Sequence, residues 1–236
     1  MPSTLLAGAT GLVGRACLDL LLEDDAFERV VVITRRTLEG ARSPKLEAHV
    51  VDFDHLDDHA ALFRVDQIVC ALGTTIRQAG SLERFRAVDY GYTLKVAELG
   101  ALQGARHFLL VSSIGANPRS RVFYPRVKGE LEEAVVALRY RSVSIVRPSV
   151  LLGERAEWGA IHCGCHPNCG IGAALMVNKY TKEVVPLTKF LNVEQLARDL
   201  RAITDANRSK PLTLAQISLA VLRNYDATQA PADLDA

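Results

Sequence analysis

Short apolar runs alternate with longer amphipathic segments over the first two thirds of the chain. The run Val30–Ile33 is apolar at every position, which is typical of a parallel strand covered on both faces of its sheet. Between such runs, apolar residues recur at the three- and four-residue spacing of a helix that faces a core. The pattern predicts strands over residues 4–7, 30–33, 48–51, 67–71, 107–111 and 143–146, and helices over residues 11–22, 82–102 and 124–138.

The strict alternation of strand and helix predicts an α/β fold with a doubly wound, mainly parallel sheet of six strands, which is the Rossmann arrangement. The alternation ends near Pro148, and residues 150–192 carry Gly, Cys and Pro with little periodicity. We therefore expect a Rossmann core over residues 1–155. Residues 156–236 are expected to form a small C-terminal extension that packs on the substrate side of the same domain.

Composition restricts the class of protein without selecting a function. The chain has 236 residues, 49% of them apolar, and a net charge of +1, so we expect a packed globule and no nucleic-acid partner. No secretory leader is recognisable, and no apolar run reaches the roughly 20 residues that span a bilayer. The five cysteines, an odd number, do not indicate the disulfide framework of a secreted domain. We expect a cytoplasmic protein without a membrane span.

Three glycines at three-residue spacing follow the first predicted strand and open the first predicted helix. Gly8 permits a tight turn, Gly11 lets a diphosphate approach the backbone, and Gly14 lets the helix pack closely on the sheet. The start of the helix then offers free N–H groups and the positive end of its dipole to an anion. This loop predicts a dinucleotide site; the alternative is a glycine-rich turn that holds no ligand.

The end of the second predicted strand distinguishes between the two nicotinamide dinucleotides. An NAD site usually has an acidic residue there, which accepts from the ribose hydroxyls. This chain reads Thr34-Arg35-Arg36 instead, and a guanidinium suits the 2′-phosphate of NADP. We therefore expect NADP(H) rather than NAD(H), the alternative being that these arginines point into solvent.

Tyr124 and Lys128 lie four residues apart at the start of a predicted helix, which places them on one helical face. A tyrosine hydroxyl has an ordinary pKa near 10, and a neighbouring ammonium lowers it toward the range of a general acid. Ser113, after the fifth predicted strand, is positioned to hold a carbonyl oxygen. The alternative interpretation is an ordinary helix start with a surface lysine.

Taken together, these segments resemble the atypical branch of the short-chain dehydrogenase/reductase superfamily, and within it the Tat-interacting-protein-like oxidoreductases and their bacterial relatives. The resemblance covers roughly residues 1–155. The segments that carry it are Gly8–Gly14, Cys70–Thr75, Arg86–Tyr90, Ser112–Ala116, Tyr124–Glu130 and Arg147–Leu151.

The resemblance implies a role for each matching residue. Ser113, Tyr124 and Lys128 would form the catalytic set. Arg35 would bind the 2′-phosphate, and Pro148 would contact the nicotinamide. The other cofactor contacts would lie along the diphosphate, the adenine and the ribose, and they are Gly8, Thr10, Gly11, Leu12, Val13, Asp52, Phe53, Ala71, Leu72, Gly73 and Ser112, together with Tyr124 and Lys128.

One cysteine-rich segment does not match this family. Cys163, Cys165, His166 and Cys169 carry side chains that bind zinc, but four ligands within seven consecutive residues are cramped and have no second cluster downstream. We therefore predict no metal site and interpret the segment as a loop with small thiols. A divergent or altered reading frame in this segment is a third interpretation.

Two functions follow from these patterns. The first is an NADPH-dependent reductase of an unidentified carbonyl or quinone-like compound. The second is a catalytically weak or inactive protein that uses NADP(H) occupancy as a regulatory signal. The fold serves both, so it does not distinguish between them. A homodimer through the helices of residues 82–102 and 124–138 is an expectation from the resemblance alone.

Overall fold

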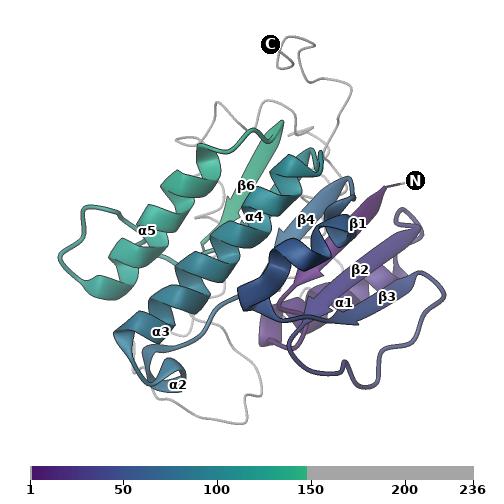
Figure 1. Cartoon of the computed structure of the whole chain (residues 1–236), viewed down its shortest axis with the longest axis horizontal. Coiled ribbons are helices and arrows are strands. Elements are labelled where there is room, and N and C mark those ends of the chain that lie inside the picture. Colours follow the sequence, from purple (N-terminus) through teal and green to yellow (C-terminus); the bar gives the residue numbers. More distant parts are fainter. Residues whose placement is uncertain (1, 148–236) are drawn as a thin grey trace, which may run out of the picture.

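The computed structural model describes residues 2–147 of the chain, and its central feature is a six-stranded, fully parallel sheet (Figure 1). The strand order is β3-β2-β1-β4-β5-β6, which is the Rossmann order predicted from the sequence. The order reverses between β1 and β4, and ligands of such sheets bind beyond the carboxyl ends of the strands at this point. The strands are β1 (Ser3–Ala7), β2 (Arg29–Thr34), β3 (Leu46–Val50), β4 (Gln67–Cys70), β5 (His107–Val111) and β6 (Ser142–Val146).

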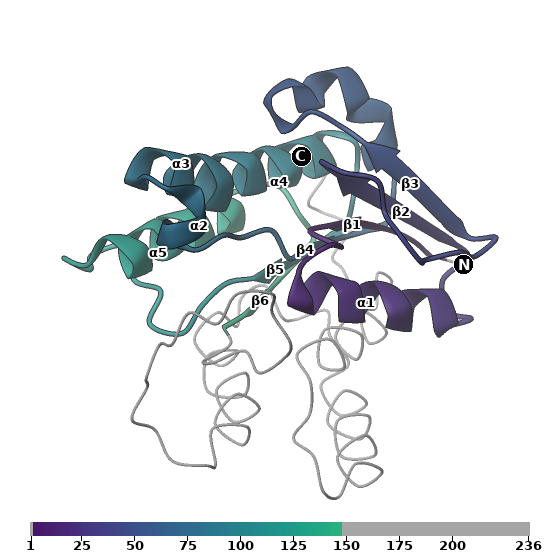
Figure 2. The ribbon, with the colours of Figure 1, turned by 90° about the horizontal axis from the view of Figure 1, so that it is seen from below.

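Helices cover both faces of the sheet, as Figure 2 shows: α1 lies on one face, and α3, α4 and α5 lie on the other. Two 3₁₀ or π segments and the short α2 complete the described part of the chain. The helical elements are α1 (Leu12–Glu23), the 3₁₀ segment η1 (Phe53–Phe63), α2 (Ile76–Ala79), α3 (Leu82–Arg86), the π segment η2 (Ala87–Tyr92), α4 (Thr93–Leu102) and α5 (Phe123–Val136).

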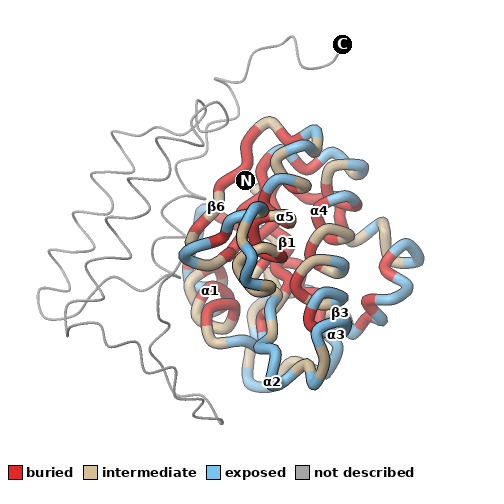
Figure 3. The backbone as a smooth tube through the Cα atoms, turned by 90° about the vertical axis from the view of Figure 1, so that its left-hand side faces the viewer, coloured by how far each residue is buried: buried red, intermediate tan, exposed pale blue. Residues whose placement is uncertain are grey.

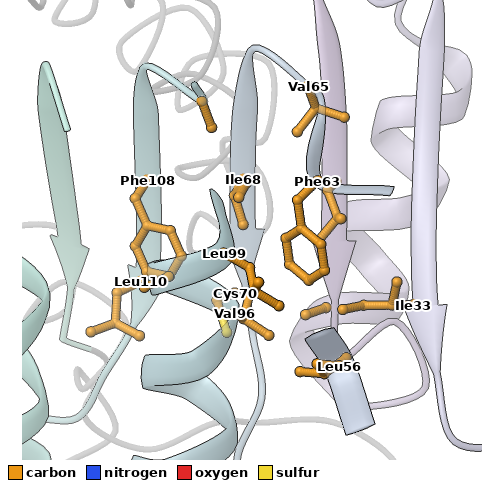
Figure 4. Packing of buried hydrophobic residues seen from close by; sticks show 14 of the residues in the cluster. Ile33, Leu56, Phe63, Val65, Ile68, Cys70, Val96, Leu99, Phe108 and Leu110 are labelled. Carbon is orange, nitrogen blue, oxygen red and sulfur yellow. The ribbon is translucent and has the colours of Figure 1, made fainter. Parts of the chain in front are cut away.

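Each face of the sheet has its own buried cluster. Under α1, the residues Val13, Cys17, Leu18 and Leu21 pack on the sheet. The helical period predicted Leu20 on this face in place of Leu18, and Leu20 is only partly buried. The larger cluster lies between the sheet and α4, α5 and η1 (Figure 4), and its central side chains include Phe63, Ile68, Val96, Leu99 and Phe108. Figure 3 shows the buried backbone at the centre and exposed turns around it.

The helix predicted over residues 82–102 is interrupted by a π turn, which the periodicity did not reveal. Val88 and Tyr92 lie at helical spacing with Phe85 and Val96, which predicts them on the buried face, but both are only partly buried. The structure buries Asp89 and Thr93 instead, at 1% and 0% exposure. The wider π turn changes which side chains face inward, and such turns often occur at functional sites. The segments η1 and α2 were also not predicted.

Candidate functional site

The glycine loop between β1 and α1 packs so closely that two of its glycines are required for the fold. Gly8 has a φ of 95°, and a Cβ atom there would lie 2.5 Å from the carbonyl oxygen of Ala71. A Cβ atom on Gly14 would lie 2.1 Å from the carbonyl oxygen of Gly8. The loop is therefore held between the carboxyl end of β4 and the first turn of α1.

Gly11 differs from these two glycines because its exposed side is open. Its N–H group donates to the carbonyl oxygen of Gly8 at 3.0 Å, and a Cβ atom on it would meet only that oxygen, at 3.4 Å. Gly11 caps α1 without a side-chain hydrogen bond, and the first turn of α1 contains no acidic residue. The first N–H groups of the helix and its positive dipole end are thus open to an anion.

An open depression of about 580 Å³ lies beside this loop. It is lined by Thr10, Arg15, Arg36, Thr37, Leu38 and Glu39. The Arg15 guanidinium donates to the carbonyl oxygen of Glu39 at 2.9 Å, which ties α1 to the segment after β2. Two guanidinium groups, those of Arg15 and Arg36, therefore line a depression that adjoins the candidate diphosphate site.

Arg35, the predicted 2′-phosphate ligand, is exposed and does not line this depression. Its positive charge acts on Tyr92, whose hydroxyl donates to the carboxylate of Asp54 at 2.7 Å. That hydrogen bond raises the pKa of Tyr92, and Arg35 opposes the rise. Arg15 was not predicted as a site residue from the sequence, although it directly follows the third glycine of the loop.

Asp52 and Phe53 follow β3, where the sequence predicted adenine contacts. Asp52 is exposed, and its carboxylate accepts from the backbone N–H of Asp54 at 3.0 Å. It also lies 2.9 Å from Nδ1 of His55, which lowers the pKa of Asp52 and raises that of His55. Phe53 is buried against Tyr92, with ring centroids 5.5 Å apart, so its ring is part of the core.

The segment after β4 adjoins the glycine loop, as predicted for a ribose contact. Ala71 donates from its N–H to the carbonyl oxygen of Ala7 at 2.9 Å, and Gly73 is exposed. Beneath Gly73 lies an ion pair in which Nζ of Lys128 is 2.6 Å from Oδ1 of Asp89. A Cβ atom on Gly73 would lie 3.8 Å from that Nζ, so the ammonium sits directly against this loop.

Tyr124 and Lys128 lie four residues apart on α5, as predicted. The ring of Tyr124 is half-buried against Phe85, with centroids 5.3 Å apart. The hydroxyl of Ser113 donates to the carbonyl oxygen of Ile114 at 3.4 Å. Within residues 2–147, no hydrogen bond joins Ser113 to Tyr124. The structure thus places the tyrosine and the lysine on one helix but does not link the serine to them.

Ser112 points to a different, buried cluster. Its hydroxyl donates to the carboxylate of Glu132 on α5, which also accepts from the guanidinium of Arg147 with Nε at 3.0 Å. Glu132 is 5% exposed, and Arg147 directly follows β6. The side chain of Ser112 is therefore engaged in joining the ends of β5 and β6 to α5. Sequence reasoning did not identify this cluster.

A family model for NAD(P)H-binding proteins matches residues 8–154, which include the glycine loop, the Asp89–Lys128 pair and Tyr124. The chain belongs to the NAD(P)H-binding family. This membership confirms the resemblance noted in the sequence, and the ligand class of the family is a nicotinamide dinucleotide.

Two curated relatives show how far the similarity of this NAD(P)H-binding chain extends. Rat HTATIP2 is 40% identical over 158 residues, which is 66% of this chain and 65% of HTATIP2. The mitochondrial protein FMP52-1 of Scheffersomyces stipitis is 37% identical over 162 residues, covering 65% of this chain and 69% of the relative. The chain thus aligns with just under two thirds of the length of HTATIP2.

Solved structures confirm the fold. MoeE5 in complex with UDP-glucose and NAD has a TM-score of 0.52 at 18% identity, covering 61% of this chain and 53% of MoeE5. A putative NAD-dependent epimerase/dehydratase from Bacillus halodurans has a TM-score of 0.54 at 21% identity, covering 69% and 80% of the two chains. At these identities, the likeness concerns the fold alone.

The relatives correct one expectation. We expected a cytoplasmic location, and this is wrong, because the FMP52 relatives are mitochondrial proteins. The expectation relied on the lack of a secretory leader and of a long apolar run. Mitochondrial transit segments are amphipathic and arginine-rich, so that test does not detect them.

Some predictions lie outside the described residues. Pro148, the C-terminal extension of residues 156–236 and the group Cys163, Cys165, His166 and Cys169 are among them. Between residues 2 and 147, no cluster of three or more His, Cys, Asp or Glu side chains is arranged to hold a metal ion. No helix in the same range has the length and apolarity to cross a membrane.

Proposed function

We propose that this chain is an NADP(H)-binding oxidoreductase of the atypical short-chain dehydrogenase/reductase type, acting on a carbonyl or quinone-like compound. The observation that carries the proposal is the meeting of three elements at one edge of the sheet. The open glycine loop adjoins the end of β4, and the Lys128 ammonium lies against Gly73 just after that strand. Tyr124 lies one helical turn before Lys128 on α5.

The residues present fit a nicotinamide dinucleotide. Gly11 leaves open space where a side chain would block a diphosphate, and α1 presents its N–H groups there without a competing cap. We infer that Thr10, Gly11, Leu12 and Val13 bind the diphosphate and that Gly73 lies along the ribose. Family membership and the NAD-bound structural neighbours support this class of cofactor.

A preference for NADP(H) follows from the positive charge after β2. Arg36 and Arg15 line the depression beside Thr10, and Arg35 lies next to Arg36. A 2′-phosphate placed there would accept charge-assisted hydrogen bonds from the guanidinium groups. No carboxylate stands at the end of β2, where an NAD site would need one for the ribose hydroxyls.

The proposed chemistry needs only a few groups of this chain. When bound, the reduced nicotinamide supplies a hydride to the carbonyl carbon. Tyr124 donates its phenolic proton to the carbonyl oxygen, which yields the alcohol, and later regains a proton from solvent. The Lys128 ammonium stabilises the phenolate that Tyr124 becomes. Ser113 would hold the carbonyl oxygen once its hydroxyl leaves the carbonyl group of Ile114.

The substitution Tyr124→Phe tests this function. It removes the proposed proton donor and keeps the ring that packs on Phe85. We expect NADPH consumption over a carbonyl and quinone panel to fall by about 10²- to 10⁴-fold, with NADPH affinity unchanged within about three-fold. Tyr90→Phe is the matched control, since it removes a partly buried hydroxyl elsewhere. Equal consumption by Tyr124→Phe and the wild type would exclude Tyr124 as the acid.

A regulatory NADP(H)-binding protein is the second candidate. The observation that favours it is the hydroxyl of Ser113, which donates to Ile114 and is not joined to Tyr124. Under this alternative, the wild type binds NADPH but does not consume it with any member of the panel. Consumption that depends on Tyr124 would exclude the alternative.

A further inference from the structure

We propose that Asp89 is the positioning residue of this site: its carboxylate holds the Lys128 ammonium against Gly73, where the cofactor ribose would lie. This inference extends the proposed function to a residue to which neither the sequence motifs nor the resemblance assigned a role. It is carried by the geometry of the buried pair and by the π turn that produces it.

Asp89 is fixed from two sides. Its Oδ2 accepts from the backbone N–H of Thr74 at 2.8 Å, which leaves Oδ1 to Nζ of Lys128 at 2.6 Å. Thr74 follows Gly73 directly, so the same carboxylate holds both the loop and the ammonium. A Cβ atom on Gly73 would lie 3.4 Å from Oδ1, so the carboxylate lies close beside this glycine.

The π turn directs Asp89 toward this position. Thr93, in the next turn, donates from its hydroxyl to the carbonyl oxygen of Val88 at 3.3 Å and thereby satisfies a carbonyl group of the widened helix. The backbone irregularity is thus stabilised by a buried side chain. Its consequence is a carboxylate at 1% exposure in place of the apolar side chain expected at this face.

Stability alone does not account for such a pair. Moving two charges out of water costs several kcal/mol each, and a well-packed apolar pair often replaces a buried ion pair without loss. Burial raises the pKa of the Asp89 carboxyl, and the Lys128 ammonium opposes this rise. What the pair provides is a charged, immobile ammonium on an otherwise flexible four-carbon side chain.

Few other titratable groups face the ammonium in the described part of the chain. From β4, the Cys70 thiol lies close enough to feel its charge, but burial raises the pKa of that thiol to about 11, so it stays neutral. On α5 itself, Tyr124 lies one turn away, while Glu130 pairs with Arg86 and Arg126 toward the surface. Asp89 therefore supplies the negative charge that balances Lys128.

The test measures NADPH dissociation constants of the wild type, Asp89→Asn, Lys128→Met and the double variant at one pH. Without Asp89, no carboxylate holds the ammonium against Gly73. We expect Asp89→Asn to bind NADPH at least about five-fold more weakly than the wild type. Because Asp89 acts through Lys128, the double variant should bind NADPH as weakly as Lys128→Met alone.

The overturning result is a double variant whose loss of NADPH affinity is the product of the two single losses. A merely structural role for Asp89, independent of Lys128, would give that product. If the wild type binds no NADPH, the proposed function fails, and the pairing is then decided by the unfolding free energies of the two single variants and the double variant.

In this double-mutant cycle of unfolding free energies, each single variant leaves one buried charge without a partner. The double variant Asp89→Asn/Lys128→Met should therefore lose less stability than the sum of the two singles. If Asp89→Asn alone does not fold, recovery of folding by the added Lys128→Met supports the pairing. Additive losses, or a double variant as unfolded as Asp89→Asn, contradict it.

Discussion

Two buried polar side chains in the described part of this molecule, His107 and Glu132, have polar partners on neighbouring elements. His107 on β5 lies with its ring nitrogens 3.1 Å from Oε1 of Gln67 and 3.0 Å from Oγ of Ser144. Glu132 likewise accepts from Ser112 and Arg147. Each of these groups would cost free energy if it were buried alone, so their partners on neighbouring elements stabilise one arrangement of strands and helices.

His107 leads to a pH prediction. Burial lowers the pKa of His107 to about 3, below its ordinary value of 6.5. As pH falls, the imidazole is therefore protonated in the unfolded chain before it is protonated in the folded chain. Stability due to the neutral ring is complete above pH 6.5 and is lost as pH falls toward 3. Between pH 7 and pH 5, the unfolding free energy of the wild type, measured by urea titration, should fall by about 2 kcal/mol more than that of His107→Gln. Parallel pH profiles would contradict the burial of a neutral ring.

Arg36 leads to a prediction of cofactor specificity. Because its side chain lines the depression beside Thr10, Arg36→Ala should weaken NADPH binding by about ten-fold or more. Binding of NADH, which has no 2′-phosphate, should change by less than about two-fold. Arg139→Ala, an exposed substitution beyond α5, is the control. Equal losses for both nucleotides would show that Arg36 does not bind the 2′-phosphate.

The sequence predicted residues whose role depends on local spacing, namely the loop glycines and the pair Tyr124 and Lys128. It did not predict Asp89, Arg15 or Glu132 as site residues. Burial and ion pairing of these side chains depend on elements far apart in the chain: Asp89 and Lys128 are joined only when α5 packs beside η2. The hydrophobic pattern of a sequence does not indicate a carboxylate that is buried together with a charged partner from a distant element.

Among the elements, strands were predicted more accurately than helices. The strand of residues 107–111 has the predicted bounds, and four of its five residues are apolar, as expected for a run covered on both faces by helices. The helix of residues 82–102 contained a π turn that reassigns its buried face from Val88 and Tyr92 to Asp89 and Thr93. A regular 3.6-residue period cannot anticipate one widened turn.

The packing of the β5–α5 connection on α5 gives a prediction for this element. A Cβ atom on Gly129 would lie 2.2 Å from the backbone nitrogen of Pro118, and backbone atoms cannot easily move away. Gly129→Ala should therefore push the connection off the helix and lower the unfolding free energy by about 1–3 kcal/mol.

Gly91→Ala is the matched control, because a Cβ atom there would meet only the Arg86 carbonyl oxygen at 4.0 Å. This control should change stability by less than about 1 kcal/mol. Both free energies come from urea titrations. A Gly129→Ala chain as stable as Gly91→Ala would show that the connection does not pack as described.

On the scale of the whole molecule, the reversal of strand order between β1 and β4 brings the functional segments together. The glycine loop follows β1, and Gly73 follows β4. The helix α5, which carries Tyr124 and Lys128, lies on the face of the sheet opposite α1 (Figure 2). Segments more than 50 residues apart in the chain thereby meet at one edge of the sheet. This convergence is predictable from the alternation of elements, whereas the substrate is not, because its choice belongs to side chains beyond the shared core.

The central claim is that the open face of Gly11 receives a diphosphate. Gly11→Ala tests it without disturbing the fold, since the added methyl group meets only the Gly8 carbonyl oxygen at 3.4 Å. Isothermal titration calorimetry with NADPH should show binding to the wild type and to Gly91→Ala, and binding at least about ten-fold weaker to Gly11→Ala, with all three chains equally stable. Unchanged NADPH affinity in Gly11→Ala, or no heat with the wild type for either NADPH or NADH, would contradict the claim.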